Sequence, residues 1–475
     1  MILRIYIPRG KEMFKKLVFT LISALFVFNV NAGQMANVEY IHQLIKQEHN
    51  IDIKYAPDLI SPRQAANMKY LLTAVDVANE ILNGEKTTDY GNGEFATRVA
   101  VDTTATIQAV RTLIKQDYKF FITTTPDTTE FSFKIQASGE FMVDWGDGKT
   151  EKIVKNDTSN QTYSHTYDTA DEYTIKMDGQ ATGYTTTVHY PSSSFSTIYF
   201  PTASNITKID GSLGEIFGTL PDGTNPIFLY TFEYAKFTTI PETLFHGITT
   251  ESKSHYAYYG MFWDSELTTI PEKLFTHTNR FSFQGMFSGC TKLTSIPENL
   301  FAGITGAPAS NMFYETFRGC SGLTGSIPEK LFASITGAPA SGMFSHTFSG
   351  CSGLTGSIPE NLFAGISGAP ASQMFLQTFY GCSGLSGNIP ENLFAGIKGA
   401  PKSSMFENTF YGCSNLTGYI PPELFAGIGT DTTASDQMSS VFYNTGLDTT
   451  CPSGTVQYTT GFESWFNGRV SCQPI

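Results

Sequence analysis

Hydrophobic residues recur at helical spacing in the first part of the chain, between residues 33 and 125. Ser61 and Pro62 suit the N-cap and first position of a helix, and Gly84 suits the residue after its end. Between these marks, apolar residues follow one another at intervals of three and four, at Met68, Leu71, Leu72, Val75, Ala78 and Leu82. The pattern predicts a helical region at 33–125, but it does not indicate the role of that region.

Beyond residue 125 the pattern changes to alternation of apolar and polar residues. Alternation at every second residue is typical of strands with one buried face. Strand-like runs occur at 131–135, 141–145, 165–167 and 172–177, and Gly146-Asp147-Gly148 is a tight-turn sequence between two of them. We therefore predict a small β-sandwich at 126–190.

A repeat with a period of 25 to 31 residues occupies much of the remaining chain, up to residue 450. Five cysteines are separated by 30, 31, 31 and 31 residues, at Cys290, Cys320, Cys351, Cys382 and Cys413. Ile-Pro, Leu-Phe and Met-Phe pairs recur with them, and the unit at 343–373 reads MFSHTFSGCSGLTGSIPENLFAGISGAPASQ. Such self-similarity indicates units that stack on one another and share a continuous core.

Each unit contains signals for a short helix and a short strand. Serine before Met-Phe can cap a helix, and phenylalanine pairs at i and i+4, such as Phe344 and Phe348, would give that helix an aromatic face. The following Leu-Thr-(Gly)-Ser-Ile segment predicts a strand that ends at the proline. The expected fold is therefore α+β and multidomain. It has a right-handed solenoid at 191–450, with one short parallel strand per repeat, after the β-sandwich and the helical region.

Residues 1–32 have the pattern of a signal peptide. Lys15 and Lys16 precede an apolar run from Leu17 to Val30, and Val30 and Ala32 are small residues suited to a cleavage site. No cysteine directly follows the expected cleavage site, and no later apolar stretch has the length of a membrane helix. We therefore expect an exported protein, secreted or on the cell surface, without a transmembrane segment after cleavage.

Charge and the distribution of reactive residues narrow the class of function. The 475 residues carry a net charge of −13, whereas nucleic-acid backbones are bound by clustered Lys and Arg, so we expect no nucleic-acid partner. The eight histidines are scattered without metal-ligand spacing, and no nucleophile stands at a defined spacing from a base. We predict no catalytic residue, no metal site and no cofactor.

A glutamate follows the Ile-Pro pair in six successive repeats. One interpretation is that each carboxylate lies in a solvated first turn after the proline. The other is that the column binds a cation or a basic partner. The six residues are Glu242, Glu272, Glu298, Glu329, Glu360 and Glu391.

The cysteines divide into two groups. Those of the repeats are predicted to form a buried ladder without bridges, because equivalent positions in neighbouring repeats point in parallel directions. Asp264 and Asn444 align with the same slot in the flanking repeats. Cys451 and Cys472 lie outside the ladder, and in an exported protein we expect them to form a disulfide within a C-terminal cap at 451–475.

Two parts of the chain resemble known families. The first has Val143-Asp144-Trp145-Gly146-Asp147-Gly148, followed by His165-Thr166-Tyr167 and Tyr173-Thr174-Ile175, and it resembles a PKD (polycystic kidney disease)-type β-sandwich. The resemblance implies that these residues are structural signatures, and that the domain is a spacer or a carbohydrate-associated module of an exported protein.

The second part is the repeat, in which Met-Phe-x-x-Cys-x-x-Leu-Thr-x-Ile looks like the leucine-rich repeats of BspA-like bacterial surface proteins. This resemblance implies a leucine-rich-repeat solenoid in an exported adhesin or surface binder. The inserted Gly-Ala-Pro-Ala-Ser segments depart from that family, and we expect them to bulge from one side.

These observations predict a secreted or cell-surface leucine-rich-repeat protein that binds an extracellular protein or glycan without catalysis, in adhesion or contact with host cells. Two alternatives stay open: a structural spacer that displays another module at the cell surface, and a secreted enzyme with an unrecognised site. The sequence does not indicate the ligand or the oligomeric state. The candidate binding face is the row of polar strand positions Thr294, Ser295, Thr324, Ser326, Thr355, Ser357, Ser386, Asn388, Thr417 and Tyr419.

Overall fold

The computed structural model describes residues 118–185, 191–249, 256–275, 282–429, 440–457 and 466–475, together with two short strands near the N-terminus. The chain divides into two units, 1–117 and 118–475. In the first unit, β1 (Arg4–Ile5) pairs antiparallel with β2 (Ile53–Lys54). The rest of the predicted signal peptide, and of the predicted helical region as far as residue 117, lies outside the described residues. Among the described residues, no helix has the length and hydropathy needed to cross a membrane.

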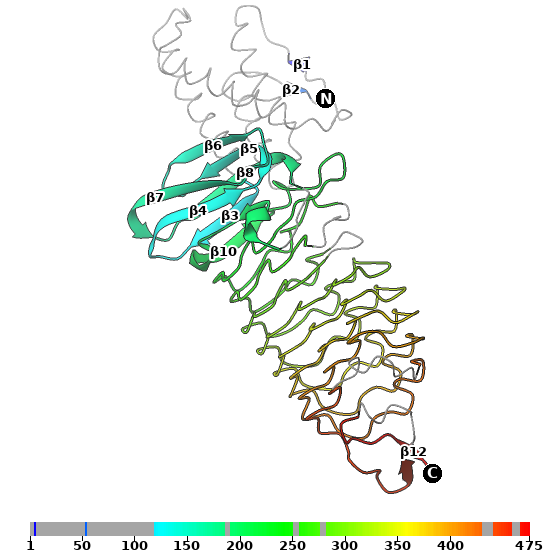
Figure 1. Cartoon of the computed structure of the whole chain (residues 1–475). Helices are drawn as coiled ribbons and strands as arrows, with labels where there is room; N and C mark the ends of the chain where they lie inside the picture. Colours follow the sequence, from blue (N-terminus) through cyan, green and yellow to red (C-terminus); the bar gives the residue numbers. More distant parts are fainter. Residues whose placement is uncertain are drawn as a thin grey trace, which may run out of the picture. The chain divides into compact units, whose positions relative to one another are not determined.

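Two antiparallel sheets form a β-sandwich at the start of the second unit (Figure 1). One sheet has the strand order β10-β3-β8-β5-β6, and the other has the order β7-β4-β9. The strands are β3 (Phe120–Thr124), β4 (Thr128–Ile135), β5 (Ala137–Asp144), β6 (Thr150–Lys155), β7 (Gln161–Asp171), β8 (Thr174–Tyr184), β9 (Ile198–Tyr199) and β10 (Ile206–Gly211), with two 3₁₀ helices, η1 (Ser193–Phe195) and η2 (Ala203–Asn205).

The predicted strand runs are confirmed, since they fall within or overlap β4, β5, β7 and β8. Buried residues alternate along β3 and β5, as expected for strands that present one face to a core. Phe133 on β4 contacts Trp145 at the end of β5, with ring centroids 5.5 Å apart, and thereby joins the two sheets. The sandwich is longer than the predicted range 126–190, because β3 lies in the part assigned to the helical region and β10 lies beyond residue 190.

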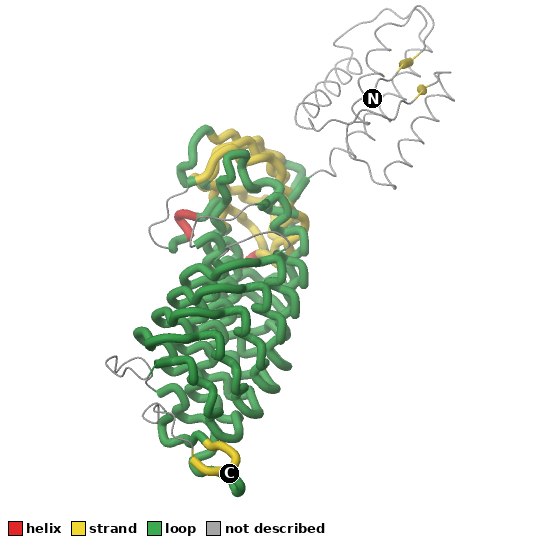
Figure 2. The backbone as a smooth tube through the Cα atoms, turned by 90° about the vertical axis from the view of Figure 1, so that its right-hand side faces the viewer, coloured by secondary structure: helices red, strands yellow, loops and turns green. Residues whose placement is uncertain are grey.

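The described residues between 212 and 447 form a stack of coils, one per repeat, which we call the repeat stack (Figures 1 and 2). The predicted leucine-rich-repeat solenoid with a parallel strand in each repeat is wrong. No helix or strand is assigned in the described part of the repeat stack, where parallel pairing is limited to isolated bridges such as Gly337 with Ile366. The α+β class is wrong as well, because the described part of the second unit contains antiparallel sheets and no α-helix.

The Met-Phe segment of each repeat is a series of overlapping turns, which we call the turn ladder, where a short helix was predicted. Alternate N–H groups donate to the carbonyl three residues back, as Tyr314 does to Asn311 at 3.1 Å. The N–H groups between them donate to the next coil, as Phe313 does to Met343 at 2.9 Å. Every fourth residue has a positive φ, for example 56° at Asn311 and 55° at Glu315. The i, i+4 spacing of the phenylalanines therefore matches the four-residue period of these turns as well as it matches a helix.

The other predictions for the repeat backbone are also corrected. The Leu-Thr-(Gly)-Ser-Ile segment donates one backbone bond to the neighbouring coil, as Thr355 does to Gly325 at 2.8 Å, whereas a strand needs a run of such bonds. The Gly-Ala-Pro-Ala-Ser segments do not bulge freely. The N–H of Gly368 donates to Gly396 at 3.0 Å, and Ala371 packs against the core. Both segments are thus held by contact between coils.

Side chains of the same kind stack along the core of the repeat stack. Eight phenylalanines form one column with ring centroids 5.5 to 5.8 Å apart and planes within 11° of parallel. The rings inside the column contribute apolar burial and an aromatic contact to both neighbouring coils. The column consists of Phe232, Phe262, Phe287, Phe317, Phe348, Phe379, Phe410 and Phe442.

The five repeat cysteines are buried and free, as predicted. Burial raises the pKa of Cys290 to about 12, which keeps the thiol protonated. The thiols are therefore available as hydrogen-bond donors, and Cys351 donates to the carbonyl of Phe317 in the preceding coil, with sulfur and oxygen 2.9 Å apart. The ladder joins successive coils by hydrogen bonds as well as by packing.

The ends of the cysteine ladder differ from the sequence alignment by one residue. Asp264 and Asn444 have positive φ values of 53° and 55°, so they occupy the slot of the glycine that precedes each cysteine. Ser265 takes the cysteine slot, and its Oγ lies 3.4 Å from the sulfur of Cys290. The prediction placed Asp264 and Asn444 in the cysteine slot, one position later in the repeat than the slot they occupy.

The first coils share their core with the sandwich. The rings of Phe141 on β5 and Phe217 lie 5.3 Å apart, and the N–H of Ala181 on β8 donates to the carbonyl of Ile216 at 2.9 Å. The buried residues of the sandwich and of the repeat stack belong to one continuous cluster. The sandwich therefore covers the open end of the first coil.

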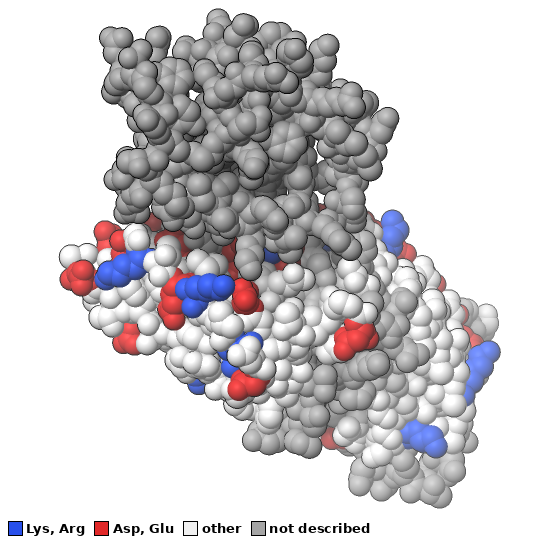
Figure 3. Space-filling view, turned by 90° about the horizontal axis from the view of Figure 1, so that it is seen from above, with Lys and Arg blue, Asp and Glu red and all other residues white. Residues whose placement is uncertain are grey.

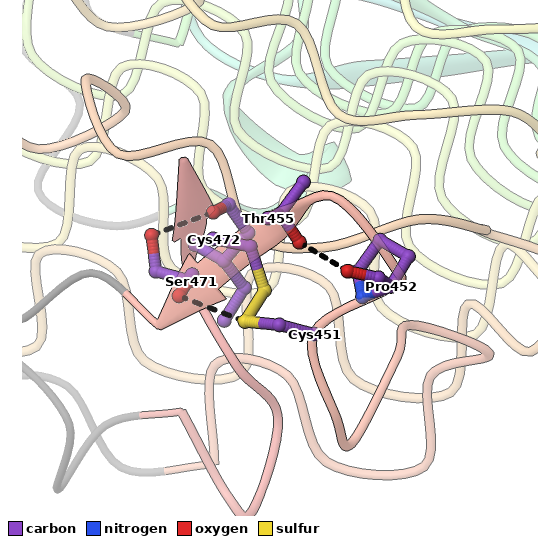
Figure 4. Close-up of a disulfide and its surroundings, with 6 residues drawn as sticks. Cys451, Pro452, Thr455, Ser471 and Cys472 are labelled. Carbon is purple, nitrogen blue, oxygen red and sulfur yellow. Dashed lines mark hydrogen bonds between the residues drawn. A yellow bond between two sulfur atoms is a disulfide. The ribbon is translucent and has the colours of Figure 1, made fainter. Parts of the chain in front are cut away.

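At the opposite end, the repeat stack is closed by a short hairpin of β11 (Thr455–Gln457) and β12 (Cys472–Pro474). Cys451 and Cys472 form the predicted disulfide, with Cα atoms 5.7 Å apart (Figure 4). The hydroxyl of Ser471 donates to the carbonyl of Ile420 at 2.8 Å, and this bond ties the cap to the last complete coil.

Candidate binding groove

The ten predicted face residues are exposed or partly exposed, but the structure does not bring all of them into one site. Ser326, Ser357 and Asn388 line a groove with a volume of about 1040 Å³. The other predicted residues do not line it: Thr294, Ser295, Thr324, Thr355, Ser386, Thr417 and Tyr419.

The groove crosses four successive coils. The first coil contributes an isoleucine and a glutamate, and each of the other three contributes a serine or asparagine, a proline ring and a glutamate. The lining residues are Ile296, Glu298, Ser326, Ile327, Pro328, Glu329, Ser357, Ile358, Pro359, Glu360, Gly387, Asn388, Pro390 and Glu391.

An extra glycine accounts for the position of the polar residues in the groove. Repeats with the sequence Leu-Thr-Gly-Ser-Ile have one residue more than those with Leu-Thr-Ser-Ile, and Gly325 and Gly356 adopt φ values of 79° and 78°. A left-handed residue at this point is readily adopted by glycine, which has no Cβ. The next residue in each repeat, Ser326 or Ser357, lines the groove.

The threonine hydroxyls of the predicted row bond within the repeat stack. Thr294 Oγ1 donates to the carbonyl of Thr268 at 3.0 Å, and Thr324 Oγ1 donates to the carbonyl of Thr294 at 3.3 Å. Both acceptors belong to the preceding coil. These threonines stabilise the stacking of coils, which explains their recurrence without a role in binding.

The glutamates of the column are held in place across neighbouring coils. Lys330 Nζ lies 3.4 Å from Glu298, and Asn361 Nδ2 donates to Glu329 at 3.1 Å. Asn392 makes the same contact with Glu360 at 3.2 Å. An amide orients a carboxylate without neutralising it, so the groove stays acidic.

The last coil changes this pairing. Glu423 occupies the slot that holds asparagine in the preceding repeats, and within the described ranges Glu391 makes no hydrogen bond or ion pair. By contrast, the described part of the face seen in Figure 3 is mostly uncharged, and several of its acidic and basic side chains lie next to one another. In the groove, all the charged residues of the lining are glutamates.

The lining of the groove combines several kinds of polar and apolar contact. The groove presents hydroxyls, an amide, carboxylates and proline rings at the spacing of successive coils. No group of three or more His, Cys, Asp or Glu side chains within the described residues is arranged to hold a metal ion. Comparison of the chain with protein-family models, with curated proteins and with solved structures finds no match.

In the sequence, the polar row and the glutamate column are two separate patterns, and neither indicates that the two share one groove. The prolines were expected only to end a strand, whereas Pro328, Pro359 and Pro390 are part of the lining. One feature of the sequence could have indicated the groove. The period changes from 30 to 31 residues where a glycine is added, and the repeats with this glycine contribute the polar lining residues.

Proposed function

We propose that this chain is an exported, non-catalytic binding protein whose groove binds an extended protein or glycan outside the cell. The observation that carries the proposal is the groove of about 1040 Å³, which repeats a glutamate over four coils and a serine or asparagine over three of them. The signal-peptide pattern at the N-terminus and the similarity of the repeat motif to BspA-like bacterial surface proteins support the extracellular setting.

An extended ligand fits this arrangement better than a compact one. Successive coils stack at about the spacing of adjacent β-strands, ~5 Å, so equivalent donors and acceptors recur at that interval. A chain-like ligand can meet several copies of the same contact, whereas a small molecule can meet only one or two. Extended surfaces of repeat proteins commonly bind ligands in this way.

A structural role as a spacer is compatible with the same fold. The continuous core between sandwich and repeat stack favours a rigid connection between them. This observation supports a display function at the cell surface as the second candidate, in which the groove would bind nothing.

Ser357→Lys and Thr355→Lys provide a matched pair for the test. Both residues are exposed and both variants add one positive charge to the same coil, but only Ser357 lines the groove. Full-length protein and the two variants would be applied to arrays of extracellular proteins and of glycans. For each ligand that the unmodified chain binds, we expect Ser357→Lys to weaken binding about tenfold or more, and Thr355→Lys to change it less than about twofold.

Salt distinguishes the two ligand classes. The net charge of −13 should steer a basic protein to the groove, so its association rate should fall as salt is added, whereas that of a neutral glycan should not. Equal effects of the two lysine variants would place the ligand elsewhere. The absence of any ligand on both arrays would favour the spacer function.

A further inference from the structure

A cluster of partly exposed aromatic residues lies on the first two coils, away from the groove lining. Tyr230, Tyr259 and Trp263 form this aromatic patch. Tyr230 stacks on Trp263 with ring centroids 5.8 Å apart, and it meets Tyr259 nearly edge to face at 5.4 Å and 69°. The rings of Tyr230 and Trp263 lie over Gly260, where a Cβ atom would approach Tyr230 to 2.7 Å.

The aromatic patch is not required by the fold of the coil. In the next coil the slots of Tyr259 and Trp263 hold Gln284 and Ser288, and the turn ladder is unchanged there. Tyr230 itself has a positive φ of 54°, a conformation that Gly260 adopts in the same slot of the following coil. The turn ladder therefore forms without these rings, although later coils place Tyr380 and Tyr411 in the slot of Trp263, where the two rings stack at 4.9 Å.

Two carboxylates border the patch, on either side of Tyr234. Glu233 is partly buried and accepts a hydrogen bond from Tyr234, while Asp264 accepts one from Trp263. Partial burial raises the pKa of Glu233, and the charge of Asp264 adds to the effect. Burial also raises the pKa of Asp264. Among the described residues, neither carboxylate is in an ion pair. Arg318, whose charge acts on Tyr259, is paired with Glu315 at 3.4 Å.

Aromatic rings next to carboxylates are suited to binding a cation. A cation placed over a tyrosine or tryptophan ring is attracted to its π face, and the attraction grows when water is excluded. The same cation would offset the unfavourable burial of the two carboxylates. A guanidinium group adds planar stacking and several N–H donors for carboxylate oxygens.

We propose that the aromatic patch, with Glu233 and Asp264, binds an arginine or lysine side chain of a basic protein segment. This site is separate from the groove, since the two share no residue. It adds a second contact surface to the proposed binding function and names the chemistry of the partner there.

An oligo-arginine peptide is the probe, measured against the full-length chain by calorimetry and by tryptophan fluorescence. Trp263→Ser and Tyr259→Gln remove rings without altering charge, and each introduces the residue found one coil later. Glu233→Gln and Asp264→Asn remove the charges. We expect each ring or charge variant to weaken peptide binding about tenfold, and Trp263→Ser to abolish most of the fluorescence change.

Glu172→Gln is the control, because it removes one exposed carboxylate of the sandwich, outside both the groove lining and the patch. It should change binding of the peptide less than about twofold. Thermal unfolding of every variant checks that the coils remain folded.

Three results would overturn the proposal. The first is that Glu172→Gln weakens peptide binding as much as Glu233→Gln does, while Trp263→Ser has no effect. That result would indicate general attraction to an acidic chain. The second is binding of a neutral oligosaccharide, lost in Trp263→Ser, without binding of oligo-arginine, which would make the patch a glycan site. The third is no binding of either probe. Failure of the groove variants alone would contradict the proposed function of the groove and leave the patch supported.

Discussion

The sandwich and the repeat stack are built from the same kinds of buried side chain, but their backbones are ordered by different means. In the sandwich, β4 pairs with β7 over a register from Ile135 with Gln161 to Glu130 with Thr166, so each sheet is a continuous ladder. In the repeat stack, backbone bonds to the next coil alternate with turn bonds inside the coil. No strand is assigned between β10 and β11 in the described residues, yet the core is continuous.

The difference shows that repetition of sequence can replace regular secondary structure. A strand is stabilised by a run of hydrogen bonds to one neighbour. A coil of the repeat stack is stabilised by identical side chains that meet their own copies, as the phenylalanine column and the cysteine ladder do. Stability in such a structure is approximately a sum of terms within units and between neighbours.

The largest loss of stability is expected when one aromatic residue is removed from the core of a coil. Phe344 is fully buried and contacts the rings of Phe313, Phe332, Phe363 and Phe375 at centroid distances of 4.6 to 5.7 Å. Phe344→Ala should lower the free energy of unfolding by about 3–5 kcal/mol, through lost burial and the cavity that remains.

Phe133→Ala in the sandwich is the matched control, since Phe133 is equally buried. Urea unfolding would be followed by circular dichroism and by tryptophan fluorescence. We expect the transition of Phe344→Ala to split between the two probes, because the weakened coil divides the repeat stack. A loss below about 1 kcal/mol would contradict the packing described here.

The next largest loss of stability is expected when the disulfide at the end of the repeat stack is removed. Cys451 and Cys472 close a loop with a sequence separation of 21 residues. Replacement of both by serine should lower the free energy of unfolding by about 3 kcal/mol in the chain-entropy model. Hydrogen exchange should show the loss in the cap and the last coils, with the sandwich protected as before.

Peptide mapping without reductant supplies the control for this comparison. It should recover Cys451 linked to Cys472 and the five repeat cysteines as thiols. Recovery of a bridge between two repeat cysteines would be incompatible with the buried ladder.

Lowering the pH is expected to cause a smaller loss of stability, which is specific to the sandwich. His165 Nε2 lies 2.9 Å from Asp147 Oδ2, and the N–H of Lys149 donates to Asp147 at 3.0 Å. Burial alone would raise the pKa of Asp147, but the bonds from His165 and Lys149 outweigh it and lower the pKa to about 2. A carboxyl with a lowered pKa stabilises the fold above its unfolded value, near 4, and the contribution is lost as pH falls from about 4 to about 2.

Asp147→Asn should therefore cost about 1 kcal/mol at neutral pH, after allowance for solvent screening of this exposed turn. The difference from the unmodified chain should shrink between pH 4 and pH 2, as measured by urea unfolding at each pH. A constant difference over this range would assign the effect to packing rather than to the charge.

The smallest expected change in stability comes from a substitution at a left-handed position, and it is the most specific test of the turn ladder. Gln373 has a φ of 59°, and Gly342 occupies its slot in the preceding coil. A left-handed residue other than glycine costs about 1 kcal/mol, so Gln373→Gly should be more stable than Gln373→Ala by about that amount. Equilibrium unfolding of the two variants measures the difference. In a helix the order would be reversed, because glycine is less favourable than alanine there by about 1 kcal/mol.

Much of this protein could be read from the sequence. Alternation at residues 131–135 and 141–145 predicted strands, because a strand pairs with neighbours through a pattern carried by its own residues. The spacing of the cysteines identified the repeating unit, the buried ladder and the terminal disulfide pair. These features depend on which residues are apolar and how often they recur, and that information is present in one chain.

The backbone of the repeats and the position of the groove depended on contacts between coils. The pair Phe344 and Phe348 suits a helix and a four-residue turn period equally well, and the choice follows from whether an N–H finds its acceptor in its own segment or in the next coil. Ser326, Ser357 and Asn388 likewise line one groove only because coils 31 residues apart in sequence lie side by side. Local sequence determines what each segment can bury and bond, but the acceptors offered by a neighbouring coil exist only after the coils have stacked.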